Sequence, residues 1–414
     1  MTTRKCLTLA ALASTLSAQT YDLLLKGGRV LDPKNRINAV MDVAIANGKI
    51  AKVAASIPAT EAKKVANVAG LTVTPGLIDI HVHVYPRPEN KSVPADSNVP
   101  ADSHTFRSGV TTVVDAGTSG WRNFPDFRER AIDKSKTRIL ALLNISGAGM
   151  GTGREDDLAE LDAAAAAKTA KANRDVVVGF KSAHFGGPGW ESVEAAVKAG
   201  READMPVMVD FGYLNGVRNL PTLLLDKLRA GDIYTHCFSG HRNELTDDNK
   251  VNPAMIAGRK RGIIFDLGFG AGSFYWYVAE PAMQQGFAPD SISTDLHTGS
   301  MNAGMKSMTN SMSSILNLGA SFEKVVEMST WNPAKEIKRT ELGNLDVGAE
   351  ADVAVLRVEK GEFGFIDSAG AGHPGNQRIV AELTIRKGRV VWDLNSRAAE
   401  NWKTFKYERK KWTK

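Results

Sequence analysis

Cysteine is scarce in this chain of 414 residues, which contains only Cys6 and Cys237. If the first residues are removed as a leader, one cysteine remains and no disulfide can form within the chain. From residue 20 onward, no apolar run is long enough to span a membrane. A glycine-rich run at 268–274 lacks the Gly-Lys-Ser/Thr ending of a phosphate-binding loop. The remainder, with 43% hydrophobic and 24% charged residues, has the composition of an ordinary globular protein.

The first 18 residues differ from the rest of the chain. A short basic start precedes about eleven mostly apolar residues that end at Leu16, and the small residues Ser17 and Ala18 follow. This order is typical of a secretory signal peptide. We therefore expect cleavage after Ala18 and a periplasmic or secreted protein. The alternative is a disordered leader on a cytoplasmic protein.

The net charge of +6 is concentrated in a C-terminal tail, residues 401–414. Residues 403–414 contain six Lys or Arg against the single acid Glu408. The aromatic residues of the tail are Trp402, Phe405, Tyr407 and Trp412. Basic and aromatic residues together can contact nucleic acids or membranes, but so short a segment forms no recognised binding module. We expect the tail to dock on its own domain or on a second subunit of a homo-oligomer, with no nucleic acid and no stable membrane insertion.

Short apolar runs recur at regular intervals through the middle of the chain. After the run that ends at His81, they are Val110–Ala116, Ile139–Ile145, Val176–Lys181, Pro206–Phe211, Ile233–Cys237, Ile263–Leu267 and Ser291–Asp295. Helical patterns separate most of them, at 156–172, 190–203, 220–230 and 274–285. Strands that alternate with helices indicate βαβ units and a parallel sheet. Eight such units over roughly 265 residues predict an α/β fold, a (β/α)8 TIM barrel at residues 75–340.

The first of these runs ends in a His-x-His pair, His81 and His83. Side chains two apart on a strand share a face, so both imidazoles are expected at the end of the strand and on the same side. Two neutral imidazoles on one face are half of a transition-metal site. The alternative is a pair of exposed histidines in a loop.

Other strand ends carry residues of the same chemistry. Barrel enzymes place their active sites at the C-terminal ends of the strands, and here those ends carry Lys181, Asp210, His236 and Asp295. Each is a metal-ligand type or, for the lysine, could become one. A lysine could instead extend to solvent, and an aspartate could cap the following helix.

Together these residues resemble the amidohydrolase superfamily, and more narrowly the amidohydrolase/deacetylase metallohydrolases related to dihydroorotases and D-aminoacylases. The motifs that carry the resemblance are His81-Val-His83, Thr111–Gly117, Gly179-Phe-Lys181, Thr235–Phe238, Ser293–His297 and Gly343–Asp352. The resemblance covers nearly all of the chain after residue 20. It implies a second, smaller β-sandwich domain built from both chain ends, residues 19–74 plus 341–400. Strand patterns at 21–31, 42–50, 352–356 and 383–392 agree with it.

The resemblance also implies a divalent metal, most simply zinc, at one or two ions per chain. His81 and His83 would hold the first ion, and Asp295 would sit at it as general base and then general acid. Lys181, as a carbamate, would bridge to a second ion held by His236. Metal-bound hydroxide would be the nucleophile, because the pKa of a metal-bound water falls to roughly 7.

One strand end departs from the family pattern. Family members usually end the fifth strand with a histidine that binds the second metal, whereas this chain has Asp210. A carboxylate can bind zinc at nearly the same distance as an imidazole, roughly 2.0–2.2 Å. Direct ligation, ligation through water and a one-metal site all remain open.

The substrate should be a small molecule, recognised by the loops that follow the strands. Arg154 and Arg218 could clamp a substrate carboxylate, and His184 and His297 could contact substrate or orient a ligand; for each, an ordinary structural role is the alternative. The implied reaction is hydrolysis of a small N-acyl or O-acyl compound. The alternatives are a cyclic-amide hydrolase of the dihydroorotase or hydantoinase kind and an inactive scaffold protein.

Overall fold

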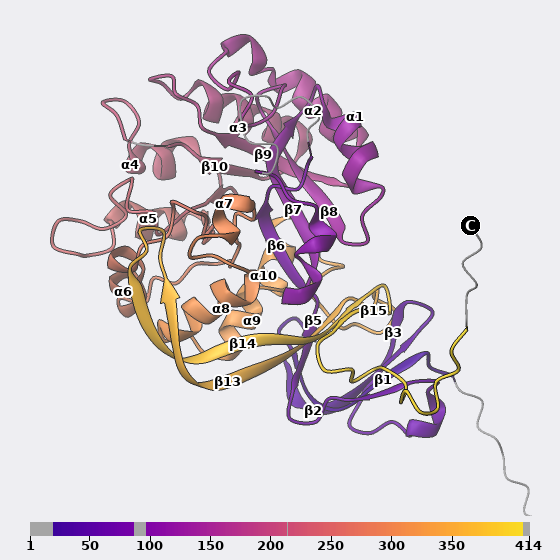
Figure 1. Ribbon diagram of the computed structural model, residues 1–414. Coiled ribbons are helices and arrows are strands. Elements are labelled where there is room, and N and C mark those ends of the chain that lie inside the picture. Colours follow the sequence, from indigo (N-terminus) through magenta and orange to yellow (C-terminus); the bar gives the residue numbers. More distant parts are fainter. Residues whose placement is uncertain (1–19, 87–96, 213, 409–414) are drawn as a thin grey trace, which may run out of the picture.

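The computed structural model describes residues 20–86, 97–212 and 214–408. The expected signal peptide, residues 1–18, lies outside them. Among the described residues, no helix combines the length and apolarity needed to cross a membrane. Figure 1 shows two parts: a curled sheet surrounded by helices, and a second sheet in which the two ends of the chain meet.

A parallel sheet of seven strands carries the candidate site, and its spatial order is β12-β11-β10-β9-β8-β7-β6. The strands are β6 (Leu77–Val82), β7 (Val110–Gly120), β8 (Arg138–Asn144), β9 (Val177–Ala183), β10 (Val207–Asp210), β11 (Ile233–Tyr234) and β12 (Ile264–Phe265). Every neighbouring pair is parallel. All C-terminal ends therefore open on the same rim, and the seven strands lie at seven of the eight predicted runs.

The eighth predicted strand, Ser291–Asp295, is not a named strand. Its segment lies between the two outer strands of the sheet, with isolated parallel bridges from Ser291 to Asp266 and from Leu296 to Val82. The His83 N–H donates to the Leu296 carbonyl at 2.9 Å. The sheet thus curls until its edges approach one segment from both sides, whereas a closed eight-stranded barrel stays a prediction.

Helices and apolar side chains cover the outside of this sheet. The helices are α1 (Phe124–Phe127), α2 (Ala163–Ala172), α3 (Glu191–Ala203), α4 (Leu220–Thr222), α5 (Pro253–Lys260), α6 (Trp276–Gln284), α7 (Thr298–Met301), α8 (Met308–Asn317), α9 (Phe322–Met328) and α10 (Trp331–Glu336). Helix α2 begins later than the pattern at 156–172 predicts, because the Asp162 side chain accepts from the N–H groups of Ala164 and Ala165 and so caps it there.

The second sheet is mixed and joins both ends of the chain. Its strands are β1 (Leu23–Asp32), β2 (Ile37–Ala46), β3 (Lys49–Ala54), β4 (Val65–Asn67), β5 (Thr72–Pro75), β13 (Val353–Ile366), β14 (Gly372–Arg386) and β15 (Arg389–Asp393). The two ends meet where β5 pairs antiparallel with β13. The strands form one sheet, and the predicted sandwich stays a prediction.

The hairpin of β13 and β14 is much longer than the strand patterns at 352–356 and 383–392 predict. Its far part leaves the second sheet and lies against α8 (Figure 1), where the Ile379 N–H donates to Ser313 Oγ at 2.9 Å and the Asn376 N–H to Asn317 Oδ1 at 2.9 Å. This part alternates exposed and half-buried residues and contains several glycines, so it lacks the apolar run that would have marked it as a strand.

The C-terminal tail differs from expectation in its described part. Trp402, Phe405 and Tyr407 are exposed by 70%, 48% and 67%. Docking of these three aromatics on their own domain is therefore wrong; Phe405 and Tyr407 contact each other instead, with ring centroids 5.0 Å apart. Docking on a second subunit stays a prediction.

Candidate metal centre and active site

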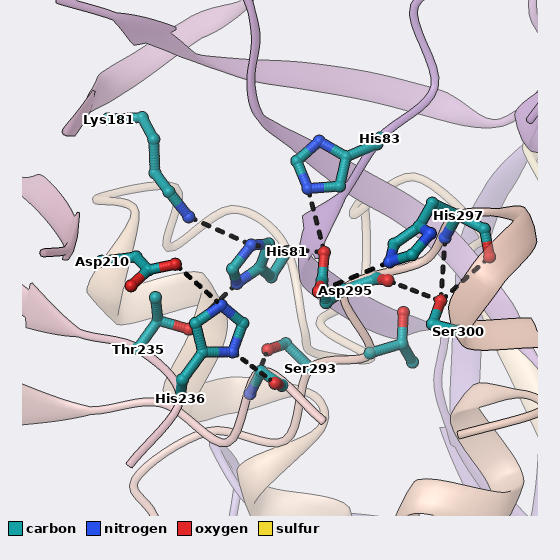
Figure 2. A network of polar contacts seen from close by, with 12 residues as sticks. His81, His83, Lys181, Asp210, Thr235, His236, Ser293, Asp295, His297 and Ser300 are labelled. Carbon is teal, nitrogen blue, oxygen red and sulfur yellow. Dashed lines mark hydrogen bonds and ion pairs between the residues drawn. The ribbon is translucent and has the colours of Figure 1, made fainter. Parts of the chain in front are cut away.

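The predicted ligands meet in one cavity at the rim of the parallel sheet. Figure 2 shows His81, His83, Lys181, Asp210, His236 and Asp295 turned toward one another, although they come from the end of β6, from β9 and β10, from the loop after β11 and from segment 291–296 after α6. The cavity has a volume of about 330 Å³. Its other lining residues are Ser97, Asn98, Thr118, Met150, Gly151, His184, Ala271, Gly272 and His297.

Three of these side chains form a ready cation site. Single ligand atoms of His81, His83 and Asp295 all lie within 4.8 Å of one another. Asp295 Oδ1 is 2.9 Å from His83 Nε2 and 3.7 Å from His81 Nε2. Both histidines are buried, with exposed fractions of 1% and 5%. Two imidazole nitrogens and one carboxylate oxygen are a donor set that suits a divalent transition metal.

Hydroxyl groups behind the cavity fix the orientation of the histidines. Thr235 Oγ donates to Asp266 at 2.7 Å, so its oxygen accepts from His81 Nδ1 at 2.9 Å. The proton of His81 is thereby held on Nδ1, and the Nε2 lone pair points into the cavity. His83 Nδ1 lies 2.8 Å from Thr118 Oγ, and this contact fixes the ring so that its Nε2 faces Asp295 in the cavity. The arrangement prepares both rings to bind a metal.

The charges around the cluster agree with this role. Burial, helped by the Lys181 charge, lowers the pKa of His81 to about 3, so this ring is neutral at pH 7. Burial acts to raise the pKa of Asp295, but its hydrogen bond with His83 and the neighbouring histidines hold that pKa below the ordinary value. The site therefore offers a neutral imidazole and an ionised carboxylate, the protonation states that metal binding requires.

A second group of donors lies across the cavity from the first. Lys181 Nζ is 3.0 Å from His81 Nε2, and His236 Nε2 is 3.4 Å from Asp210 Oδ2. Burial lowers the pKa of the Lys181 amine, although Asp210 and Asp295 oppose the shift. Asp210 is 7% exposed. The residue that departs from the family pattern thus faces the histidine with which it would share an ion.

The partner of Asp210 is Arg242, which sequence reasoning missed. Arg242 follows β11 in a loop, donates from Nη2 to Asp210 Oδ1 and is 3% exposed. Burial would raise the pKa of Asp210, but Arg242 and then His236 hold it well below the ordinary value. A buried carboxylate at a strand end requires a cation or several hydrogen-bond donors. The sequence could therefore have predicted a cationic partner for Asp210, but not that the partner is Arg242.

His297 and His184 lie at the mouth of the cavity. The Gly299 N–H donates to His297 Nδ1 at 3.1 Å, so the proton of the neutral ring is on Nε2, which is 3.8 Å from Asp295 Oδ2. His184 Nε2 is 3.8 Å from Asp210 Oδ2, and its side chain is 56% exposed. Both can contact a substrate and a carboxylate of the site at once.

The two arginines suggested as substrate clamps do not line the cavity. Arg154 has a side chain that is 60% exposed and pairs with Glu160 at 3.2 Å. Arg218 is buried, and its guanidinium donates to the carbonyls of Phe185 and Phe211 at 2.6 and 3.0 Å. The prediction for Arg218 is corrected on this geometry: it ties two loops together, because buried carbonyls satisfy its donors. The structure does not bring Arg154 to the cavity either, because its guanidinium pairs with Glu160 outside the lining.

Several residues of the site adopt an unusual backbone. His184, His236 and Asp295 have φ of 57°, 61° and 52°, the left-handed region. An L-residue pays roughly 1–2 kcal/mol there, and such strain is common where a site must aim a side chain. Two glycines make room beside them: a Cβ on Gly268 would lie 2.7 Å from His236 Nδ1, and one on Gly270 2.8 Å from Asp295 Oδ2.

Replacement of Gly270 by alanine should therefore damage the site selectively. The new methyl group pushes Asp295 away from His83, and a displacement on the scale of 1 Å costs about 100-fold in rate. The measurement is kcat/KM of the purified, metal-loaded variant. Gly286→Ala is the matched control, since Gly286 has φ of 79° and no atom within 4 Å of its Cβ position. It carries the same backbone cost outside the cavity, and equal losses in both variants would contradict the explanation.

Comparison with known proteins shows which protein family shares this sequence. A model described as "Amidohydrolase family" matches residues 72–219 and 276–383. The matched ranges contain His81, His83, Lys181, Asp210 and Asp295. His236 and Arg242 lie in the unmatched stretch between them. The segment between the two matched ranges, residues 220–275, supplies both partners of Asp210.

Individual proteins agree with the family match. A "Deacetylase" of Enterococcus faecalis is 31% identical over 381 residues, which cover 89% of this chain and 99% of that protein. A crystal structure of an adenine deaminase superposes with a TM-score of 0.81 at 30% identity and covers 90% of this chain and 100% of that one. A dihydroorotase structure gives 0.77 at 29% identity, with 90% and 99% covered. Each of these likenesses extends over nearly the whole described chain.

Proposed function

The chain belongs to the amidohydrolase family and is a hydrolase acting on C–N bonds, and from that premise we propose that it removes the acyl group of a small N-acyl or O-acyl compound. The convergence of His81, His83 and Asp295 in one cavity carries the proposal. The similar deacetylase of Enterococcus faecalis supports the choice of an open acyl compound. A cavity of about 330 Å³ is of the size that takes a small molecule.

The residues suit a divalent metal, for which we propose zinc. His81 and His83 would hold it through Nε2, with Asp295 beside them. A bound divalent ion lowers the pKa of a water ligand to roughly 7 and polarises the scissile carbonyl. We further propose a carbamate on Lys181: the neutral amine attacks carbon dioxide, an N–C bond forms and one proton is released. Burial of Lys181 among the ligands supports it, since burial favours the neutral amine.

Asp295 would move the proton. Its Oδ1 lies beside His83 and its Oδ2 faces the cavity mouth, near His297. An ionised carboxylate in this place can accept the proton of the attacking water and then deliver it to the departing nitrogen or oxygen. His297, with its proton on Nε2, can donate a hydrogen bond to the substrate and keep it against Asp295.

We also propose the finer architecture that this function would use. Segment 291–296, paired on both sides, would act as the eighth strand and close a (β/α)8 barrel at residues 75–340. Residues 19–74 and 341–400 would form the accompanying domain. The support for closure is the pair of parallel bridges to Asp266 and Val82.

A substrate panel tests the proposed reaction. Metal-loaded enzyme is given N-acetyl amino acids and O-acetyl hydroxy acids, and separately the ring compounds dihydroorotate, hydantoin and adenine. We expect kcat/KM for the best open acyl compound to exceed that for any ring by about 100-fold, because specific contacts to the correct substrate are worth a few kcal/mol. Faster ring opening would support the cyclic-amide alternative, and deamination of adenine would support the activity named for the deaminase neighbour.

Two controls complete the panel. The Asp295→Ala variant, purified in the same way, reports any hydrolysis by a contaminant. Enzyme assayed across several metals separates an inactive protein from one with the wrong ion. If no compound is hydrolysed with any of the metals, the result would favour the alternative that the protein is an inactive scaffold.

A further inference from the structure

The two oxygens of Asp210 have different partners. Oδ1 accepts from the guanidinium of Arg242. Oδ2 faces His236 Nε2 at 3.4 Å and His184 Nε2 at 3.8 Å. The carboxylate is therefore held by one oxygen and presents the other to the cavity, as Figure 2 shows for the side facing His236.

The hydrogen-bond partners of His236 determine which of its nitrogens faces Asp210 as a lone pair. His236 Nδ1 lies 2.6 Å from the Gly268 carbonyl, which can only accept, so the proton of the neutral ring is on Nδ1. In this form of the ring, the Nε2 lone pair faces the Asp210 Oδ2 oxygen, and both atoms can serve as metal ligands. Two tetrahedral ligands with bonds of about 2.1 Å are roughly 3.4 Å apart. The observed 3.4 Å is the separation that one shared cation produces.

Arg242 cannot itself move to a substrate. Its Nε donates to the Gly212 carbonyl at 2.7 Å and its Nη1 to Ser239 Oγ at 3.3 Å. Its guanidinium carbon lies 5.0 Å from the Phe211 ring centre and 5.7 Å from that of Tyr234. With 3% exposure it is fixed in the wall of the cavity. Its remaining influence acts through Asp210.

Arg242 also balances charge. A lone carboxylate would add an uncompensated negative charge to a buried group of donors, whereas Arg242 places a cation directly against it. Holding Oδ1 also prevents both oxygens from binding one ion side by side, so the carboxylate behaves as a donor with a single oxygen.

We propose that Arg242 is a positioning residue that makes Asp210 a one-oxygen donor, so that Asp210 and His236 together hold a second divalent ion. The inference deepens the proposed function, since it concerns the same cavity. It assigns a role to a loop residue in the stretch that the family match leaves out. It concerns ion binding only and requires no particular substrate.

Metal binding by the full chain tests the proposal without any substrate. Metal-free protein is titrated with Zn²⁺ or Mn²⁺ in buffer with bicarbonate, with stoichiometry from calorimetry and from plasma mass spectrometry after dialysis. We expect two ions per chain. Arg242→Met should weaken the second ion by about 10- to 100-fold, the usual effect of removing a group that orients a ligand. The first ion, held by His81, His83 and Asp295, should change less than about twofold.

A double-mutant comparison separates positioning from mere structural support. In an Asp210→His background the donor is neutral and needs no cation, so adding Arg242→Met should change the affinity for the second ion less than about threefold. Arg242→Lys keeps the charge and should recover part of the loss. Arg259→Met is the matched control: Arg259 also pairs with an aspartate, Asp290 at 3.3 Å, and lies over the Phe287 ring, but outside the cavity.

Four results would overturn the proposal. One ion per chain in the wild type at saturating metal would mean that Arg242 supplies the only second cation. Equal weakening by Arg242→Met in both backgrounds would mean that its effect does not pass through Asp210. Equal weakening of both ions, or the same effect from Arg259→Met, would indicate general damage to the fold. None of these results bears on which substrate is hydrolysed, so the two proposals fail separately.

Discussion

Replacing Asp295 by alanine is expected to lower kcat/KM by about 10³- to 10⁴-fold, at the upper end of what a general base contributes. The reason is geometric: Asp295 is the carboxylate of the cluster that faces both histidines of the pair, with Oδ1 2.9 Å from His83 Nε2. Without it, the attacking water loses its proton acceptor and the leaving group its donor. The measurement is kcat/KM with the best substrate of the acyl panel, on protein of known metal content.

The metal content decides how that loss is interpreted. His81 and His83 remain in the alanine variant, so we expect at least part of the first metal to stay bound. Asp295→Asn is the comparison variant, because it keeps the shape and one oxygen but cannot take a proton at neutral pH. Both variants should be inactive with metal present. Activity above a tenth of the wild-type value in either variant would remove Asp295 from the proton transfer.

Removing the metal is expected to abolish activity and to lower the thermal stability of the protein. A ligand present at 100 to 1,000 times its dissociation constant stabilises the folded state by about 3–4 kcal/mol. In this chain, loss of the ion also leaves the Asp295 carboxylate and two histidine nitrogens facing one another inside a buried cluster. The measurements are activity and the melting temperature, before and after dialysis against a chelator.

Adding the ion back should restore both the activity and the thermal stability. Zinc or manganese added to metal-free protein should return both activity and melting temperature, and a His81→Asn/His83→Asn variant should gain neither. If the metal-free wild type kept its activity, catalysis would not depend on a metal in this cavity. A return of stability without activity would indicate a metal that supports structure only.

The parallel sheet was predictable because its strands bury both faces. Runs such as Ile139–Ile145 are almost wholly apolar, and the structure has strands at seven of the eight runs. The exception, Ser291–Asp295, alternates serine with other residues, and its hydrogen bonds go partly to side chains: Asp79 accepts from the N–H and the hydroxyl of Thr294 at 3.1 and 2.5 Å. Such side-chain pairing leaves no trace in a pattern of hydrophobicity.

The sequence predicted which side chains meet in the cavity, because they lie at strand ends. It did not predict the residues that hold those side chains in place. Parallel strands bring their C-terminal ends to one rim, so residues as distant in sequence as His81 and Asp295 share a cavity. Arg242 and the glycines at 268 and 270 lie in loops, where no periodic pattern fixes direction. The clamp role for Arg218 failed for the same reason, since its buried carbonyl partners are Phe211 of its own loop and Phe185 of the loop after β9.

The pairing of β5 with β13 has a consequence for how the chain acquires its structure. Val353 lies opposite Pro75, so the second sheet joins segments that are 278 residues apart in a chain of 414. Contacts of such long range are slow to form, because a large loop must close first. During synthesis β5 leaves the ribosome long before β13 has been made. The edge of β5 that later pairs with β13 therefore stays unpaired while the parallel sheet assembles. We expect this unpaired edge of β5 to be the part of the folding chain that pairs most readily with a strand of another molecule.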